Sequence, residues 1–304
     1  MSVTPNLKSV ARYATPIRSV LRSSGDDAVE YLSWATNYND KGHQLDELKY
    51  FADGEVEEHH RYSYNEEGHI ILHEVSLPED GIEESFITER DVNGWPITIV
   101  KMYGDDPGEK TIYEYNESGQ PLKIIQYDAD GELDSSEEIK YDSNGNMLER
   151  IINAPSAERP YRKVTFKYND KNLLVIAEEF DADNKSVGRH EYSYNDDGLE
   201  TKLLQYNDQG KKTAEVDSDY NEIGKIIRKV SRGFYTRISN FEYDELGRIV
   251  EESLSDENGF VISRSNFEYN EKGELIGEII YETDLTRAGR DTHLSYRYEY
   301  SYFS

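Results

Sequence analysis

The chain has 304 residues, with 62 acidic and 34 basic side chains, a formal net charge of −28 and a mean hydropathy of −0.84. Nucleic acid and anionic membrane surfaces would repel such a charge, so neither is expected as a direct partner. There is no cysteine, which excludes disulfides, thiolate nucleophiles and cysteine metal sites, and no run of 18 apolar residues long enough to span a membrane.

Residues 1–30 are interpreted as an N-terminal cap or a degenerate repeat. The stretch YATPIRSVLRSSGDD, which starts at Tyr13, is a faded copy of the repeat that fills most of the chain. Residues 1–24 carry four basic side chains and no acidic one, but they lack the apolar core of a secretory signal. We therefore expect the protein to be cytoplasmic.

Residues 31–284 are predicted to form one domain of about ten repeats of 26 residues. The motif Tyr-[Asn/Asp]-x-x-Gly recurs, with degenerate copies RDVNG at Arg90 and YNDKN at Tyr168, and successive anchors lie 23 to 27 residues apart. A second turn falls halfway through most units, as in YDADG and YNDQG. Two short segments between turns in each unit predict hairpins joined in a continuous antiparallel meander. The anchors that keep the full motif are Tyr38, Tyr64, Tyr115, Tyr141, Tyr194, Tyr220, Tyr243 and Tyr269.

The turn residues and the alternation before them predict how each strand lies. Asn or Asp can bond amides further along the turn, and glycine three residues later accepts a left-handed conformation, which is typical of a type I turn followed by a glycine bulge. Tyr113 and Tyr115 should share one face of a strand, with Glu114 between them in water. The predicted fold is all-β, a curled single sheet or barrel-like structure with aromatic rings inside, and residues 285–304 supply a closing strand.

The stretch YDELGRIVEESLSDENG at residues 243–259 closely resembles the RHS/YD repeat, with Tyr243, Asp244, Gly247, Arg248 and Ile249 in the family's order. The resemblance covers residues 38–281, although most other copies begin Tyr-Asn. Family members are usually very long shells around a C-terminal toxin. This chain shows no cargo domain and no self-cleavage segment, so we do not expect a toxin carrier. Small repeat proteins of this kind often accompany secreted antibacterial toxins as immunity proteins, and the resemblance implies that role.

The residues give little sign of chemistry. His43 and His69 occupy the same slot after a turn glycine, and the adjacent His59 and His60 must face opposite sides of a strand, so they cannot form a metal pair on one face. The segment DADGE at 128–132 looks like a calcium loop, but its twelfth position is Ile139 instead of glutamate. We predict no enzyme activity, no catalytic residue, no cofactor and no metal site.

Acidic residues are concentrated between residues 46 and 140, where 26 Asp and Glu face 7 Lys and Arg, a net charge of −19. A nuclease must be basic to hold phosphates, and a row of carboxylates would attract it. We predict an immunity protein that binds and occludes a secreted toxin, with a basic nuclease as the favoured partner. The alternatives are that the acids only deter aggregation of sheet edges, or that the protein is a carbohydrate- or surface-binding scaffold. The predicted partner-binding residues lie on or beside turns: Asp53, Glu55, Glu66, Glu67, Glu79, Asp80, Asp105, Asp106, Glu117, Asp128 and Asp130.

Overall fold

The computed structural model describes residues 6–17, 29–158, 160–283 and 292–304. Within these residues all regular secondary structure is β-strand. The strand pairings are antiparallel and, apart from that of β1 with β22, join strands that are consecutive in the sequence, so the predicted all-β meander is confirmed. The chain divides into two compact units, one comprising Met1–Ser85 with Arg237–Ser304 and the other Phe86–Thr236. Most of the faded copy that starts at Tyr13, from residue 18 onward, lies outside the described residues. The predicted domain boundaries at residues 30 and 284 stay a prediction.

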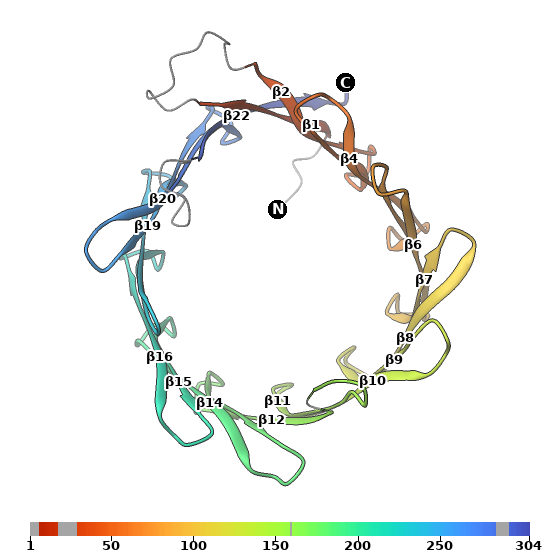
Figure 1. Ribbon diagram of the computed structural model, residues 1–304, viewed down its shortest axis with the longest axis vertical. Coiled ribbons are helices and arrows are strands. Elements are labelled where there is room, and N and C mark those ends of the chain that lie inside the picture. The colour runs from red at the N-terminus through yellow and green to blue at the C-terminus, as the bar shows by residue number, and fades with distance from the viewer. Residues whose placement is uncertain (1–5, 18–28, 159, 284–291) are drawn as a thin grey trace. The chain divides into compact units, whose positions relative to one another are not determined.

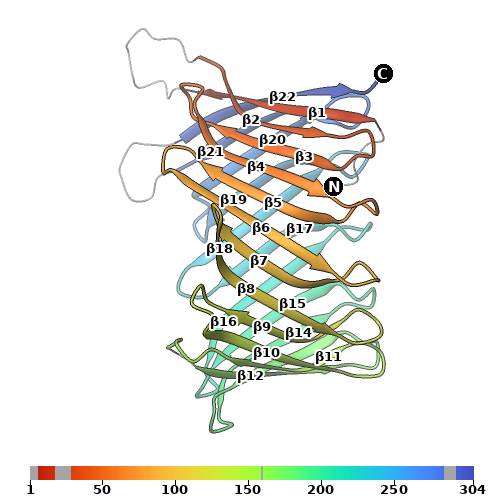
Figure 2. The same cartoon turned by 90° about the vertical axis from the view of Figure 1, so that its right-hand side faces the viewer.

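The first unit joins strands from both ends of the chain. The first strand, β1, pairs with β2 on one side and with the last strand, β22, on the other (Figure 2). The two ends of the chain thus pair directly with each other within this unit. The strands of the first unit are β1 (Leu7–Pro16), β2 (Tyr31–Tyr38), β3 (Gln44–Tyr50), β4 (Val56–Tyr64), β5 (Ile70–Leu77), β19 (Ile249–Asp256), β20 (Val261–Tyr269), β21 (Leu275–Glu282) and β22 (Thr292–Tyr302). The unit also contains nearly all of β18 (Thr236–Tyr243) and the start of β6 (Ile82–Arg90).

The second unit is an uninterrupted meander. Each strand pairs with the next one in the sequence, and in Figure 1 they follow one another from yellow through green to cyan. The strands are β7 (Pro96–Tyr103), β8 (Asp106–Tyr115), β9 (Pro121–Tyr127), β10 (Leu133–Tyr141), β11 (Met147–Asn153), β12 (Tyr161–Tyr168), β13 (Leu174–Phe180), β14 (Ser186–Tyr194), β15 (Glu200–Asn207), β16 (Lys212–Tyr220) and β17 (Ile226–Arg232).

The turns that follow the anchor positions, here called tyrosine turns, share one hydrogen-bond pattern. At Asn195 the backbone N–H donates to Leu199 O at 2.9 Å, and Asn195 Oδ1 accepts from Leu199 N at 2.9 Å. Gly198 closes the turn at φ +81°, and the register shifts between Ser193 and Tyr194. These features match the predicted turn and bulge. In the degenerate copy at Tyr168, Asn172 takes φ +59° in place of glycine, as asparagine can in this region.

Anchor tyrosines tie neighbouring repeats together through their hydroxyl groups. Tyr220 Oη donates to Glu200 O at 2.7 Å, which belongs to the strand that begins just after the preceding tyrosine turn. A phenylalanine could fill the same space but could not donate this bond. The same bond recurs from Tyr64 to Gln44, Tyr115 to Pro96, Tyr141 to Pro121, Tyr168 to Met147 and Tyr194 to Leu174.

The faces of the sheet are half buried, as the composition suggested. The rings of Tyr113 and Tyr115 stack on one side with centroids 6.2 Å apart, while Glu114 is exposed, which confirms the predicted alternation. Buried apolar side chains are few among the described residues: Leu7, Val10, Ala14, Ile139 and Val230. Most of the stabilisation therefore comes from strand pairing and from contacts between half-buried side chains.

Candidate functional site

In the first unit the predicted carboxylates lie on both edges of the sheet. Glu66 and Glu67 form the tip of the tyrosine turn between β4 and β5. The other turns, between β3 and β4 and between β5 and β6, lie at the opposite ends of these strands and carry four more of the predicted residues. The four residues on these other turns are Asp53, Glu55, Glu79 and Asp80. Their side chains and those of Glu66 and Glu67 are exposed.

In the second unit one predicted residue has a structural role. Asp128 is half buried, and its Oδ1 accepts hydrogen bonds from the N–H groups of Asp130 at 3.0 Å and Glu132 at 2.8 Å, which shape the turn. Glu117 lies on a tyrosine turn, whereas Asp128 and Asp130 lie on the opposite edge. The remaining predicted residues are Asp105, which lies between β7 and β8, and Asp106, the first residue of β8; both lie on that same opposite edge and are exposed.

The tip that carries Glu66 and Glu67 is held by hydrogen bonds, and its two carboxylates form no internal ion pair among the described residues. Asn65 Oδ1 accepts from His69 N at 2.8 Å, and Gly68 N donates to Asn65 O at 3.1 Å, so the tip that carries Glu66 and Glu67 is held from both sides. Neither carboxylate forms an ion pair with any residue that the structure describes. A cationic side chain of a partner could approach them without displacing an internal cation, which keeps the cost of binding low.

Acidic residues elsewhere are engaged in ion pairs within the sheet. Glu215 on β16 lies 2.9 Å from Lys202 and also contacts Lys212, and hydrogen bonds from Lys212 and then Lys202 lower the pKa of the Glu215 carboxyl to about 2. Asp217 contacts Lys202 at 3.0 Å and also Arg232. These carboxylates stabilise cross-strand contacts and offer little charge to a partner.

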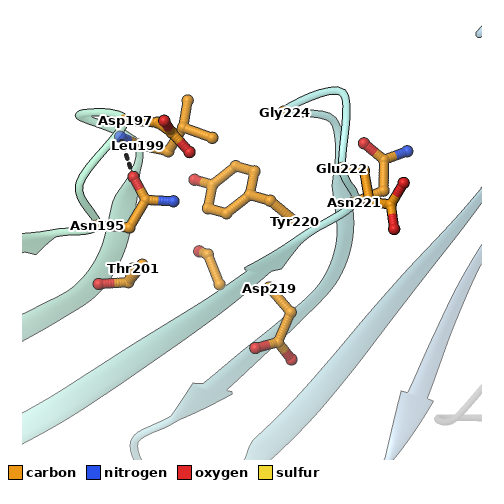
Figure 3. Close-up of a pocket in the computed structure, with 10 residues that line it drawn as sticks. Asn195, Asp197, Leu199, Thr201, Asp219, Tyr220, Asn221, Glu222 and Gly224 are labelled. Carbon is orange, nitrogen blue, oxygen red and sulfur yellow. Dashed lines mark hydrogen bonds between the residues drawn. The ribbon is translucent and has the colours of Figure 1, made fainter.

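A shallow groove lies between two consecutive tyrosine turns of the second unit. Figure 3 shows the ring of Tyr220 between the turns, with its hydroxyl directed toward the turn that carries Asn195 and Leu199. Asp197 and Glu222 flank the ring, and the lining contains no basic residue. A corresponding groove in the first unit, beside Tyr64, includes Lys41 and His43 in its lining. Consecutive tyrosine turns thus form a groove of this kind in both units, and the charge of the groove depends on the residues at the turn tips.

The structure also brings together a cluster that the sequence analysis missed. His60 Nδ1 on β4 lies 2.8 Å from His73 Nε2 on β5, and His60 Nε2 lies 2.7 Å from Glu58 Oε1. Lys49 on β3 contacts the other oxygen of Glu58. Alternation correctly separates His59 from His60, but only the register between β4 and β5, in which Tyr62 opposes His73, could have shown this pair.

No metal centre follows from this cluster. Within the described part of the chain there is no group of three or more His, Asp or Glu side chains that could hold a metal ion. None of the described segments is a helix with the length and apolarity that crossing a membrane requires. The absence of enzyme activity and of a cofactor stays a prediction.

The strands, ties and turns define an all-β repeat protein of tyrosine-anchored hairpins with acidic tips. No protein-family model matches the chain. A stretch of 118 residues is 31% identical to the tRNA3(Ser)-specific nuclease WapA of Bacillus spizizenii, a match that covers 39% of this chain and 4% of that protein. The chain therefore spans a small part of the length of the curated relative that it matches.

Solved structures with related strands share little sequence with the chain. The complex named TcdB2-TccC3-TEV is 12% identical, with 81% of this chain and 17% of that chain covered and a TM-score of 0.29. A porin-like protein from Bacteroides uniformis is also 12% identical, with 99% of both chains covered and a TM-score of 0.34. Likenesses at these scores carry no argument about function.

Proposed function

We propose that the protein is an immunity protein that binds and occludes a secreted antibacterial toxin, with a basic nuclease domain as its preferred partner. The observation that carries the proposal is the set of exposed carboxylates on turn tips within residues 46–140. Glu66 and Glu67 are examples, and no cationic side chain among the described residues forms an ion pair with them. The partner would be recognised as a protein, without direct contact to nucleic acid or membrane, and the encounter would occur in the cytoplasm.

Physical chemistry favours this pairing. A nuclease holds phosphates with Lys and Arg, so its active-site surface is basic. Carboxylates fixed at turn tips would accelerate the encounter, and half-buried tyrosines and apolar tip residues would slow dissociation. The local similarity to a protein named as a tRNA-specific nuclease supports a link between such repeats and nuclease-bearing proteins.

That similarity also favours a second candidate function. The chain would then be a repeat scaffold within a nuclease-bearing protein of the same kind as the relative. A scaffold of this kind would enclose or present its own nuclease and would not protect cells from one supplied separately. The carbohydrate-binding alternative stays a prediction, and binding to a glycan array would favour it.

Co-expression with a basic nuclease toxin encoded beside the gene tests the proposal. The wild-type protein should restore growth, and the double variant Glu66→Gln/Glu67→Gln should bind the toxin about 3- to 10-fold more weakly, because it loses two steering charges. The matched control is Asp196→Asn/Asp197→Asn, which removes two exposed acids from the same type of turn outside residues 46–140. The control should protect as well as the wild type.

One result would count against the immunity role and another against recognition through these tips. If the wild-type protein restores growth with none of the nucleases encoded beside its gene, the scaffold candidate would be favoured. Equal loss of binding in both double variants would show that overall charge matters and that the 46–140 tips have no special part.

A further inference from the structure

The cross-strand contact between His60 and His73 has a proton requirement that follows from its geometry. Two imidazole nitrogens 2.8 Å apart form a hydrogen bond only when one carries a proton and the other offers a lone pair. Because His60 Nε2 lies 2.7 Å from the Glu58 carboxylate, that nitrogen is the one that carries a proton. When both imidazoles are positively charged, each ring nitrogen carries a proton. Two N–H groups would then face each other, and the contact would be lost.

The surroundings hold this cluster in place. The side chain of His60 is 18% exposed and that of Glu58 is 23% exposed. The ring of Tyr62 stacks on His73 with centroids 4.7 Å apart and an interplanar angle of 6°. Lys49 anchors Glu58 from β3, so the chain of contacts runs across three strands. A change at the histidine pair therefore acts on all three.

We propose that His60 and His73 form a proton-sensitive clasp between β4 and β5. The clasp is closed when a single proton lies between His60 Nδ1 and His73 Nε2, and it opens when both rings are positively charged. The clasp lies in the strands that carry the Glu66 and Glu67 tip between them. The inference does not depend on the toxin-binding role.

The neighbouring charges determine the direction of the effect. Desolvation, followed by the charge of His60, lowers the pKa of His73 below its ordinary value. The unfolded or open form then binds a proton more readily than the closed form, so the stabilisation is complete above about pH 6.5 and is lost as the pH falls toward the lowered value. Hydrogen bonding to Lys49 lowers the pKa of Glu58, which therefore stays ionised through this window. The charged or titratable groups beside the pair on the same face of the sheet are Glu47, which opposes His60, and Lys49 on β3, and Glu58 and Tyr62 on β4.

Amide hydrogen exchange of β4 and β5 tests the clasp. Protection corrected for intrinsic exchange should fall by up to about tenfold per pH unit between about pH 6.5 and 5, because the open form takes up one more proton. In His73→Gln the amide N–H can donate to Nδ1 of neutral His60, and the amide oxygen can accept from it when His60 is charged. The contact then persists at any pH, so the part of the fall that belongs to this pair should disappear. Burial also lowers the pKa of His59, on the opposite face, so in the control His59→Gln the fall in β4–β5 protection should shrink by the share of that histidine but remain.

Three results would overturn the clasp. One is protection in the wild type that does not change across this pH range. Another is an undiminished fall in His73→Gln. The third is a fall that disappears in His59→Gln alone, which would assign the proton to the other face of the sheet.

Discussion

The glycine at the end of a tyrosine turn meets two requirements at once. Gly119 has φ +79°, a conformation that costs other residues free energy, and a Cβ built on it would lie 2.6 Å from the Trp95 ring. Trp95 follows the glycine of the preceding turn and also contacts Tyr115, with ring centroids 5.5 Å apart. The sequence predicts the first requirement from the turn motif. It does not predict the second, because the overlap of successive turns depends on strand register.

A pair of glycine substitutions separates these requirements. Gly131 shares φ +79° with Gly119, but a Cβ built on it has no heavy atom within 4 Å. Gly131→Ala should therefore lower the free energy of unfolding by about 1 kcal/mol from backbone strain alone. Gly119→Ala should cost about 1–3 kcal/mol more, because Trp95 must move. Urea unfolding monitored by tryptophan fluorescence would measure the difference, and equal costs would contradict the close packing of Trp95 against Gly119.

At the scale of the strand and its turn, the tyrosine hydroxyl explains why the anchor is tyrosine. The bond from Tyr220 to Glu200 O connects a strand end to the beginning of the preceding strand, across a spacing of 20 residues. The period of the sequence predicts the strands and turns, including the degenerate copy RDVNG, where Arg90 replaces tyrosine and donates to Gly94 O at 2.8 Å. The partner of the hydroxyl is a backbone carbonyl, which carries no sequence signature.

Removing one such hydroxyl should weaken the contact between neighbouring repeats. Tyr220→Phe should lower the free energy of unfolding by about 1 kcal/mol, because Glu200 O loses its side-chain donor. Tyr127→Phe is the control, since the Tyr127 hydroxyl makes no hydrogen bond to any residue that the structure describes. Denaturant titration of both variants gives the comparison. A loss in Tyr127→Phe as large as that in Tyr220→Phe would show that the tie adds nothing.

At the scale of the whole molecule, the sequence predicts the fold more completely than it predicts which surface side chains are free to bind a partner. Repeat spacing predicted the antiparallel strands, and alternation predicted that Tyr113 and Tyr115 share a face. The residue counts show the acidic block between residues 46 and 140, but they do not show the role of each acid. Asp128 shapes its turn, whereas Glu66 and Glu67 face water. The His60–His73 contact escaped prediction because pairing across strands depends on register, which a single sequence does not specify.

The most direct test of the proposed role is the salt dependence of association between this protein and a basic nuclease from a neighbouring gene. Between roughly 50 and 500 mM NaCl the association rate constant should fall about tenfold or more, while the dissociation rate constant changes little, because screening acts on the encounter between exposed charges. Glu66→Gln/Glu67→Gln should show a shallower dependence than the wild type. An association rate that is unchanged by salt and by this double substitution would contradict recognition through the acidic turn tips.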